Sequence, residues 1–421
     1  MKLSELQGQK RLVASNAADA AGRGLSDFTL EMLFVVTLGA SAFQMGLLNA
    51  LGSVAFVVAT IPAGYLVDKI SALRILRLGL GAKVVLLACL LMLTVTQTLN
   101  IAVGLVLAAL LGFCNVFSET SQVAAVPEVD RGRKSLGTLI ARLAAADQAI
   151  GIIIPAVAGT LFALLGAAPL LAASLTLALA ALGLACAIHR AKDPHKDSPE
   201  VDASLRDEVS FFGGVRYLFS SRTLVALTFS VMFCNLGLAT GSAVEGIFVV
   251  NELQFGAQGY GIYAAVGGIG GLIGAAVSSR LAQWFTPVQL AVPSVVGQIV
   301  FSGFVLLANF TDRHWAMILL AAHALGWGVV VIVFNVAVST WVVEVTPEDL
   351  LGRLLSARRL FTFGVVPLGG LLGGYLGSTF GISVALAAWV GSSLLGLLCF
   401  AVFKPWSFDS QLDDQTEAVA E

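Results

Sequence analysis

Residues Pro62 to Arg77 read PAGYLVDKISALRILR, and they close one long apolar run and open the next. Gly64 lies near the end of the first run, where the missing side chain lets two helices approach closely. Asp68 follows one helical turn later, where a carboxylate can hold the N-terminus of a neighbouring helix or pair with a base such as Lys69 or Arg74. The stretch is therefore a short charged turn between two helices. In the simplest interpretation, Asp68 caps the next helix and the bases orient the loop.

The composition is that of a protein that crosses a membrane many times. Of 421 residues, 57% are apolar and only 12% are charged, which is far from the balance of a soluble protein. The net charge of −2 gives no indication of nucleic-acid binding. Five cysteines lie inside apolar runs without metal or redox spacing: Cys89, Cys114, Cys186, Cys234 and Cys399. We expect no metal, no cofactor and no nucleic-acid partner.

The apolar runs are long enough for about twelve transmembrane helices, since a span needs ~20 apolar residues. The sequence predicts them at about 17–39, 42–67, 72–97, 99–126, 135–165, 168–189, 222–250, 257–284, 287–310, 314–344, 351–379 and 381–403. The fold class is therefore an all-α membrane protein.

Basic residues alternate between the two sides of the predicted membrane. The loops after the even-numbered spans hold nearly all Lys and Arg, whereas those after the odd-numbered spans hold only Arg313. Residues 1–15 carry bases but no apolar region followed by a cleavage site. By the positive-inside rule, we expect both termini in the cytoplasm.

A polar segment divides the chain almost at its middle. The sequence predicts an N-terminal six-helix half at 1–189, a cytoplasmic linker at 190–214, a C-terminal six-helix half at 215–404 and an acidic tail at 405–421. A mixed apolar and charged stretch at 205–222 suits a helix lying in the membrane interface. The halves share a spacing, Pro-Glu followed by Gly-Arg, at 127–133 and 347–353. Related halves are typical of secondary transporters.

The charged turn resembles the G-x-L-x-D-(R/K)-x-x-x-R signature of the major facilitator superfamily. The matching residues are Gly64, Leu66, Asp68, Lys69 and Arg74, whereas Ser71 replaces the usual second glycine. The resemblance implies two pseudo-symmetric six-helix halves, with the cytoplasmic hinge formed by Gly64, Asp68, Lys69 and Arg74.

More narrowly, the chain resembles the drug and siderophore exporter branch, which contains the enterobactin exporter and macrolide efflux pumps. The matching stretches are GASAFQMG at 39–46, the signature at 64–74, Val-Pro with Arg-Gly-Arg at 126–133, and GGVRYL at 213–218. The span 5 motif of many antiporters is altered, because Ile154 stands beside Pro155 where a glycine is common. The resemblance implies a monomeric efflux antiporter of the cell inner membrane, associated with multidrug resistance.

Ionisable residues inside the spans mark candidate functional positions, because each costs of order 3 kcal/mol to insert. The sequence places them at Asp19, Arg23, Asp27, Glu31, Glu119, Arg142, Asp147, Glu245 and His323. Span 3 is interpreted as carrying bases only near its cytoplasmic end. In the family the resemblance names, spans 3, 6, 9 and 12 are peripheral, and these charges lie on the other spans. The predicted substrate cavity comprises Asp27, Glu31, Glu119, Arg142, Asn235, Glu245 and His323.

Depth along each helix suggests partners. At ~1.5 Å per residue, Asp27, Glu119 and Arg142 all lie ~12 Å deep, which makes Glu119 and Arg142 a natural pair on adjacent spans. The pair is equally consistent with a structural lock and with a cavity lining. Arg23, one turn from Asp19 and Asp27, is interpreted as a structural ion pair with them.

Two carboxylates lie deeper, and we assign them to proton coupling. Glu31 and Asp147 are ~18–20 Å deep, near the middle of a ~30 Å core, with no evident base at their depth. Asp147 is the first candidate, and Glu31 either couples protons or binds a cationic substrate. Glu245 and His323 are the alternatives as coupling or gate residues.

The predicted function is proton-coupled export of a small amphipathic compound by alternating access. The alternatives are an uptake symporter or a lipid flippase on the same fold, and, in another class, a membrane-embedded enzyme or sensor. The sequence has no H-E-x-x-H, no Walker loop and no soluble catalytic domain, so we expect no enzyme.

Overall fold

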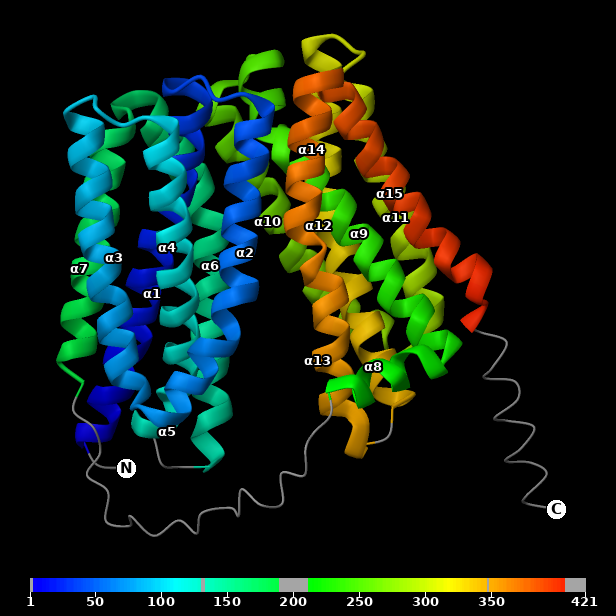
Figure 1. Ribbon diagram of the computed structural model, residues 1–421, viewed down its shortest axis with the longest axis horizontal. Helices are drawn as coiled ribbons and strands as arrows, with labels where there is room; N and C mark the ends of the chain where they lie inside the picture. Colours follow the sequence, from blue (N-terminus) through cyan, green and yellow to red (C-terminus); the bar gives the residue numbers. More distant parts are fainter. Residues whose placement is uncertain (1–2, 130–132, 189–210, 347, 406–421) are drawn as a thin grey trace. The chain divides into compact units, whose positions relative to one another are not determined.

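The computed structural model describes residues 3–129, 133–188, 211–346 and 348–405, and within these ranges it contains helices and no strands (Figure 1). The chain divides into two compact units. Unit 1 comprises Met1–Lys196 with Ala243–Gly268, and unit 2 comprises Asp197–Ser242 with Ile269–Glu421. The halves predicted at 1–189 and 215–404 differ from these units in the placement of 243–268, and their boundaries stay a prediction.

Unit 1 contains the first helices of the chain, with α1 in contact with α6 and α7. In addition, α2 packs on α4, and α3 packs on α4 and α7. The helices are α1 (Leu3–Met32) followed by a π-helical turn η1 (Leu33–Thr37), α2 (Ala42–Lys69), α3 (Ala72–Val95), α4 (Ile101–Ala124), α5 (Val126–Val129), α6 (Arg133–Leu165) and α7 (Ala167–Cys186).

Unit 2 packs α11 against α12 and α15, α14 against α15, and α8 against α13. Its helices are α8 (Phe211–Ser220), α9 (Arg222–Ile247) with the π-helical turn η3 (Phe248–Glu252), α10 (Gly256–Leu281), α11 (Pro287–Ala308), α12 (Arg313–Glu344), α13 (Glu348–Gly364), α14 (Val366–Phe380) and α15 (Ile382–Phe403). The boundary between the units crosses α9 after Ser242 and α10 after Gly268, so the end of α9, η3 and the start of α10 belong to unit 1.

The predicted all-α membrane fold is confirmed. Eleven helical segments of the described chain are long and apolar enough to cross a membrane. The predicted first span is the exception, because α1 carries several charged side chains. The helix itself begins at Leu3, before the start of the predicted span at about residue 17. The earlier turns are held by packing: Leu12 is fully buried, and the Ser15 hydroxyl donates to the Ala181 carbonyl over 2.9 Å.

Two spans end at a single glycine with a left-handed backbone. Gly166, with φ +76°, joins α6 to α7, and Gly381, with φ +93°, joins α14 to α15. A residue with a side chain is strained at such φ values, whereas glycine is not. The predicted span 11 matches one apolar segment, Ala357–Phe380, but its helix is interrupted at Val365. Here α14 begins at Val366 beside Pro367, which has no backbone N–H to continue the helix of α13.

Glycines in unit 2 let helices cross closely. A Cβ at Gly373 would lie 2.0 Å from the Thr240 carbonyl oxygen, and one at Gly270 would lie 2.2 Å from that of Leu325. The glycine runs near residues 270 and 370 therefore serve helix packing.

Candidate functional site

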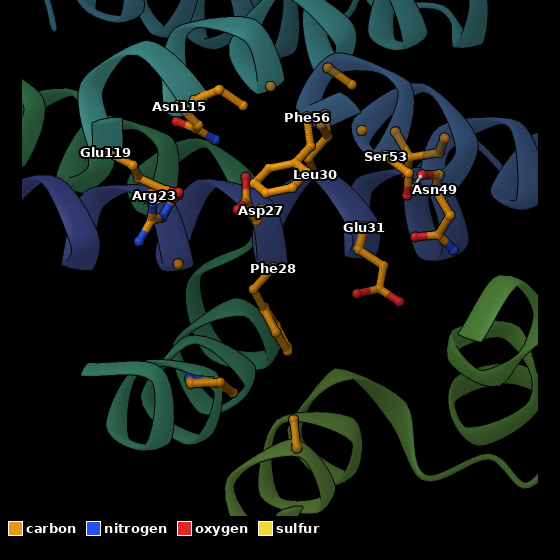
Figure 2. A pocket seen from close by; sticks show the side chains of 18 of the residues that line it. Arg23, Asp27, Phe28, Leu30, Glu31, Asn49, Ser53, Phe56, Asn115 and Glu119 are labelled. Atoms are coloured by element: carbon orange, nitrogen blue, oxygen red, sulfur yellow. Dashed lines mark hydrogen bonds and ion pairs between the residues drawn. The ribbon is translucent and has the colours of Figure 1, made fainter. Parts of the chain in front are cut away.

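Unit 1 contains a cavity of about 630 Å³ between α1, α2, α4, α6 and the start of α10 (Figure 2). Its wall is a mixture of charged, amide and aromatic side chains. The main lining residues are Arg23, Asp27, Phe28, Leu30 and Glu31 of α1, Asn49, Ser53 and Phe56 of α2, Asn115 and Glu119 of α4, Pro155 of α6, and Tyr260 and Ala264 of α10.

The polar wall of the cavity continues a stripe along α1. Asn16, Asp19, Arg23, Asp27 and Glu31 follow one another at spacings of three or four residues, so they lie on one face of the helix. Figure 2 shows Arg23, Asp27 and Glu31 in this order along the helix, with Asn49 and Ser53 of α2 beyond Glu31. Side chains of this face contact residues of α3, α4, α6 and α10.

Arg23 forms a salt bridge with Glu119 across α1 and α4. In this structure Glu119 therefore forms its salt bridge with Arg23, whereas the sequence predicted Arg142 as its partner. Likewise, Arg23 forms its salt bridge with Glu119, whereas the sequence predicted Asp19 and Asp27. Arg142 is exposed on α6. Arg23 lies at nearly the same predicted depth in the membrane as Glu119. Depth alone does not distinguish Arg23 from Arg142 as the partner, because it does not give the direction in which a side chain points around its helix. The two side chains are 21% and 45% exposed, so the pair is partly hydrated.

Asp19 has a different partner, Lys83 of α3. Lys83 Nζ lies 2.5 Å from Asp19 Oδ1, and the Gln122 amide of α4 donates to Asp19 Oδ2 over 3.3 Å. Lys83 and Asp19 are each 2% exposed. The expectation that span 3 has bases only near its cytoplasmic end was wrong, because Lys83 lies ~16 Å along the helix from Ala72. This ion pair joins α1 to α3, away from the cavity.

Glu31 is held by groups on α9 and α10. The Tyr260 hydroxyl donates to Glu31 Oε1 over 2.8 Å. A Cβ added at Gly246 would lie 2.6 Å from the same oxygen, so the carboxylate occupies space that only a glycine leaves. The Tyr260 ring lies 6.0 Å from the ring of Phe28, its neighbour in the cavity wall.

Asp147, the predicted proton carrier, is half-buried on α6 and lies outside the lining of this cavity. Its Oδ1 accepts a hydrogen bond from the Asn16 amide over 3.0 Å. The same amide nitrogen lies 3.4 Å from the Leu143 carbonyl. Asp147 thus faces the Asn16 end of the α1 stripe, which is the end predicted to be cytoplasmic, whereas Glu31 lies at the other end.

The remaining predicted cavity residues are spread over both units. Glu245, in unit 1, accepts a hydrogen bond from the Tyr263 hydroxyl and is not part of the cavity lining. In unit 2, the Asn235 amide donates to the Thr362 carbonyl over 2.8 Å. His323 is 3% exposed and stacks on Trp327.

Of the predicted hinge residues, the structure describes the side chains of the two bases, Lys69 and Arg74. Lys69 and Arg74 are exposed at the end of α2 and the start of α3. The surroundings of Gly64 and the side chain of Asp68 lie outside the described residues. A neighbouring contact is visible: the Glu128 carboxylate accepts from the Ala72 backbone N–H over 2.6 Å and from the Ser71 hydroxyl over 2.7 Å, at the N-terminus of α3.

Sequence reasoning missed Lys83 and Tyr260. A single lysine inside an apolar span is itself a signal, because it requires a buried acid nearby. Tyrosine carries no comparable signal, since tyrosines are common at membrane interfaces. Within the described residues, no group of three or more His, Cys, Asp or Glu side chains is placed to hold a metal ion.

Comparison with solved structures gives transporters of low sequence identity. A point mutant of the nucleoside transporter NupG has a TM-score of 0.77 at 16% identity, covering 94% of this chain and 99% of the other. A bacterial homologue of the iron transporter ferroportin in an inward-facing state has 0.70 at 14% identity, covering 96% and 99%. A bacterial homologue of the human lysosomal transporter Spinster, inward-facing and occupied, has 0.70 at 14%, covering 96% and 97%. These likenesses show the fold.

Comparison with curated proteins gives no match. The family model of the Major Facilitator Superfamily matches residues 12–357, which is most of the chain and includes every residue of the cavity wall. Members of that family are transporters, and the long apolar helices described above make this one a multi-pass membrane protein. The chain belongs to the major facilitator superfamily.

Proposed function

We propose that this protein is a proton-coupled exporter of a small amphipathic compound, working by alternating access. The observation that carries the proposal is the cavity in unit 1, whose wall combines carboxylates on α1 with aromatic rings. Pockets for small molecules are typically about 300–1,000 Å³. The cavity, at about 630 Å³, is of this size.

The proposed coupling residues are Asp147 and Glu31. A coupling group must take up a proton in one access state and release it in the other. Asp147 is half-buried and has a neutral hydrogen-bond partner, Asn16, which tolerates both protonation states. Glu31 has a neutral partner too, the Tyr260 hydroxyl. By contrast, Asp19 and Glu119 each contact a base and are better suited to structural roles.

The proposed hinge is the charged turn at 64–74, with Asp68 holding the helix ends together in the outward-open state. Asp68→Asn should abolish transport while leaving substrate binding measurable. Transport at the wild-type rate in a well-expressed Asp68→Asn variant would contradict this role.

Export is tested with a panel of compounds in an efflux-deficient bacterial host. Expression should raise tolerance and lower accumulation of the exported compound, and collapse of the proton gradient should abolish both effects. Accumulation that rises on expression would support the uptake symporter instead. Movement of lipid analogues between leaflets without any compound transport would support the flippase.

The proposal places the protein in the cell inner membrane as a monomer with both termini in the cytoplasm. The even-numbered loops carry the basic residues in support of this orientation. Multidrug resistance is the expected phenotype if the carried compounds are drugs.

A further inference from the structure

The charge of the cavity wall indicates the kind of compound that it takes, and this inference rests on the proposed function. Three acids, Asp27, Glu31 and Glu119, line the cavity with one base, Arg23. Arg23 forms its salt bridge with Glu119, and within the described part of the chain no base forms a salt bridge with Asp27 or Glu31. Within the described residues, no hydrogen bond or salt bridge joins Asp27 to another side chain, and Asp27 is exposed to the cavity.

Aromatic rings line the same cavity as these two carboxylates. Phe28 follows Asp27 directly on α1, Phe56 lies on α2, and the Tyr260 ring lies 6.0 Å from that of Phe28. Figure 2 shows Phe56, Leu30 and Asp27, which line the same cavity. Carboxylates combined with aromatic faces recognise organic cations, through charge pairing and through cation–π attraction. The amides of Asn49 and Asn115 add hydrogen-bonding groups at the same wall.

Other ligand classes fit this wall less well. An anion would be repelled by Asp27 and Glu31, and a neutral compound would cover both charges without compensating them, which is costly. A metal ion would need several ligands close together, and the described residues contain no such group of His, Cys, Asp or Glu. The wall therefore favours a cation that is large and partly apolar.

Tyr260 gives this wall its geometry. A glutamate side chain has several rotatable bonds, yet Glu31 Oε1 is held from two sides, by the Tyr260 hydroxyl at 2.8 Å and by the close approach of Gly246. This contact leaves the other carboxylate oxygen for a ligand. One turn further along α10, Tyr263 makes the corresponding bond to Glu245, which does not line the cavity.

We propose that the cavity binds an amphipathic organic cation between Asp27, Glu31 and the ring of Tyr260, and that Tyr260 is a positioning residue that orients Glu31 toward the cationic group. The carboxylates supply the charge, and the Tyr260 hydroxyl fixes the direction in which one of them presents it.

The test uses monodansylcadaverine, a fluorescent amphipathic amine, and its N-acetylated form, which has the same skeleton without the charge. Binding of each to the purified full-length protein in detergent is measured by fluorescence at neutral pH. The amine should bind at least about tenfold more tightly than the acetylated form, as expected for a charge-assisted contact. Equal binding of the two probes, or no binding of the amine, would overturn the inference.

Variants separate positioning from general structure. Asp27→Asn and Glu31→Gln should each weaken binding of the amine by about tenfold and leave that of the acetylated probe unchanged. Tyr260→Phe keeps the ring and removes the hydroxyl, so it should weaken binding of the amine by about threefold to tenfold, with no further loss in a Glu31→Gln background. The matched control is Tyr263→Phe, which removes the same group beside Glu245 and should change neither affinity.

The positioning role is wrong if Tyr260→Phe weakens both probes equally, or if its effect persists in the Glu31→Gln background. The result is also separable from the proposed function. Charge-selective binding without proton-driven transport would retain the organic-cation site and contradict the coupled exporter. Proton-driven transport without charge-selective binding would retain the coupled exporter and contradict the organic-cation site.

Discussion

The interiors of the two units are filled in different ways. Unit 1 brings charged side chains from α1, α3 and α4 together in pairs, Asp19 with Lys83 and Arg23 with Glu119. In the described interior of unit 2, Trp389 packs against Gly237 and Gly241 of α9, and the rings of His323, Trp327 and Trp389 contact one another. The described interior of unit 1 thus contains ion pairs between helices, whereas the contacts named in unit 2 are close packing of apolar and aromatic groups.

Unit 2 also contains a buried base. Arg358 is 8% exposed, and its Nε donates to the Thr228 hydroxyl over 3.0 Å. Its partner is neutral, however, whereas Lys83 in unit 1 contacts a carboxylate. The buried cation of unit 2, Arg358, therefore contacts a neutral hydroxyl, whereas that of unit 1, Lys83, forms an ion pair.

Breaking the Asp19–Lys83 pair should have the largest effect on stability. Lys83→Met leaves Asp19 buried without a base, which costs about 3–5 kcal/mol for a buried pair. Asp19→Asn with Lys83→Met removes both charges and should cost less than the sum of the single changes. Thermal unfolding of the four proteins in detergent measures this. Simple additivity would contradict the contact.

Filling the space beside Trp389 should have an intermediate effect, in unit 2. A Cβ at Gly241 would lie 1.9 Å from a ring carbon of Trp389, which is an overlap. Gly241→Ala should destabilise the protein by about 1–3 kcal/mol, as overpacking does. Gly391→Ala on α15 is the control, because its Cβ would meet nothing within 4 Å. Equal unfolding temperatures for the two variants would show that unit 2 does not depend on this close contact.

The Arg23–Glu119 pair should contribute least, because Glu119 is 45% exposed. A double-mutant cycle of Arg23→Gln and Glu119→Gln should give a coupling of about 0.2–1 kcal/mol, the range of hydrated pairs. The parallel cycle of Arg142→Gln and Glu119→Gln should be additive, since Arg142 is exposed on α6. Coupling in the second cycle alone would restore the pairing predicted from depth.

The sequence predicts the helices well because each apolar run has nearly the length of a span. The predicted spans 42–67 and 287–310 correspond to α2 (Ala42–Lys69) and α11 (Pro287–Ala308). The start of α1 was not predictable from hydropathy, because its first turns are polar and are held by packing on other helices, as Leu12 shows.

The candidate site was predictable in part. Asp27, Glu31 and Glu119 line the cavity of unit 1. Their assignment to a substrate cavity stays a prediction. Their partners were not found, because residue counting gives depth along a helix but not the direction around it. Arg23 and Arg142 satisfy a depth argument for Glu119 almost equally, and only the packing of α1 on α4 selects Arg23. The Tyr260 contact joins residues 229 positions apart, beyond the reach of any local pattern.

The most direct test of the central claim, that carboxylates of unit 1 couple transport to protons, is transport by Asp147→Asn in proteoliposomes. The substrate is a compound identified by the efflux panel, and the comparison is with the wild-type protein. Exchange of labelled for unlabelled substrate needs no proton transfer, whereas concentration against a gradient under an imposed pH difference requires it. The account predicts that Asp147→Asn retains exchange and loses uphill transport. Uphill transport at the wild-type level by Asp147→Asn would contradict the assignment, and Glu31 or Glu245 would then be the leading candidate.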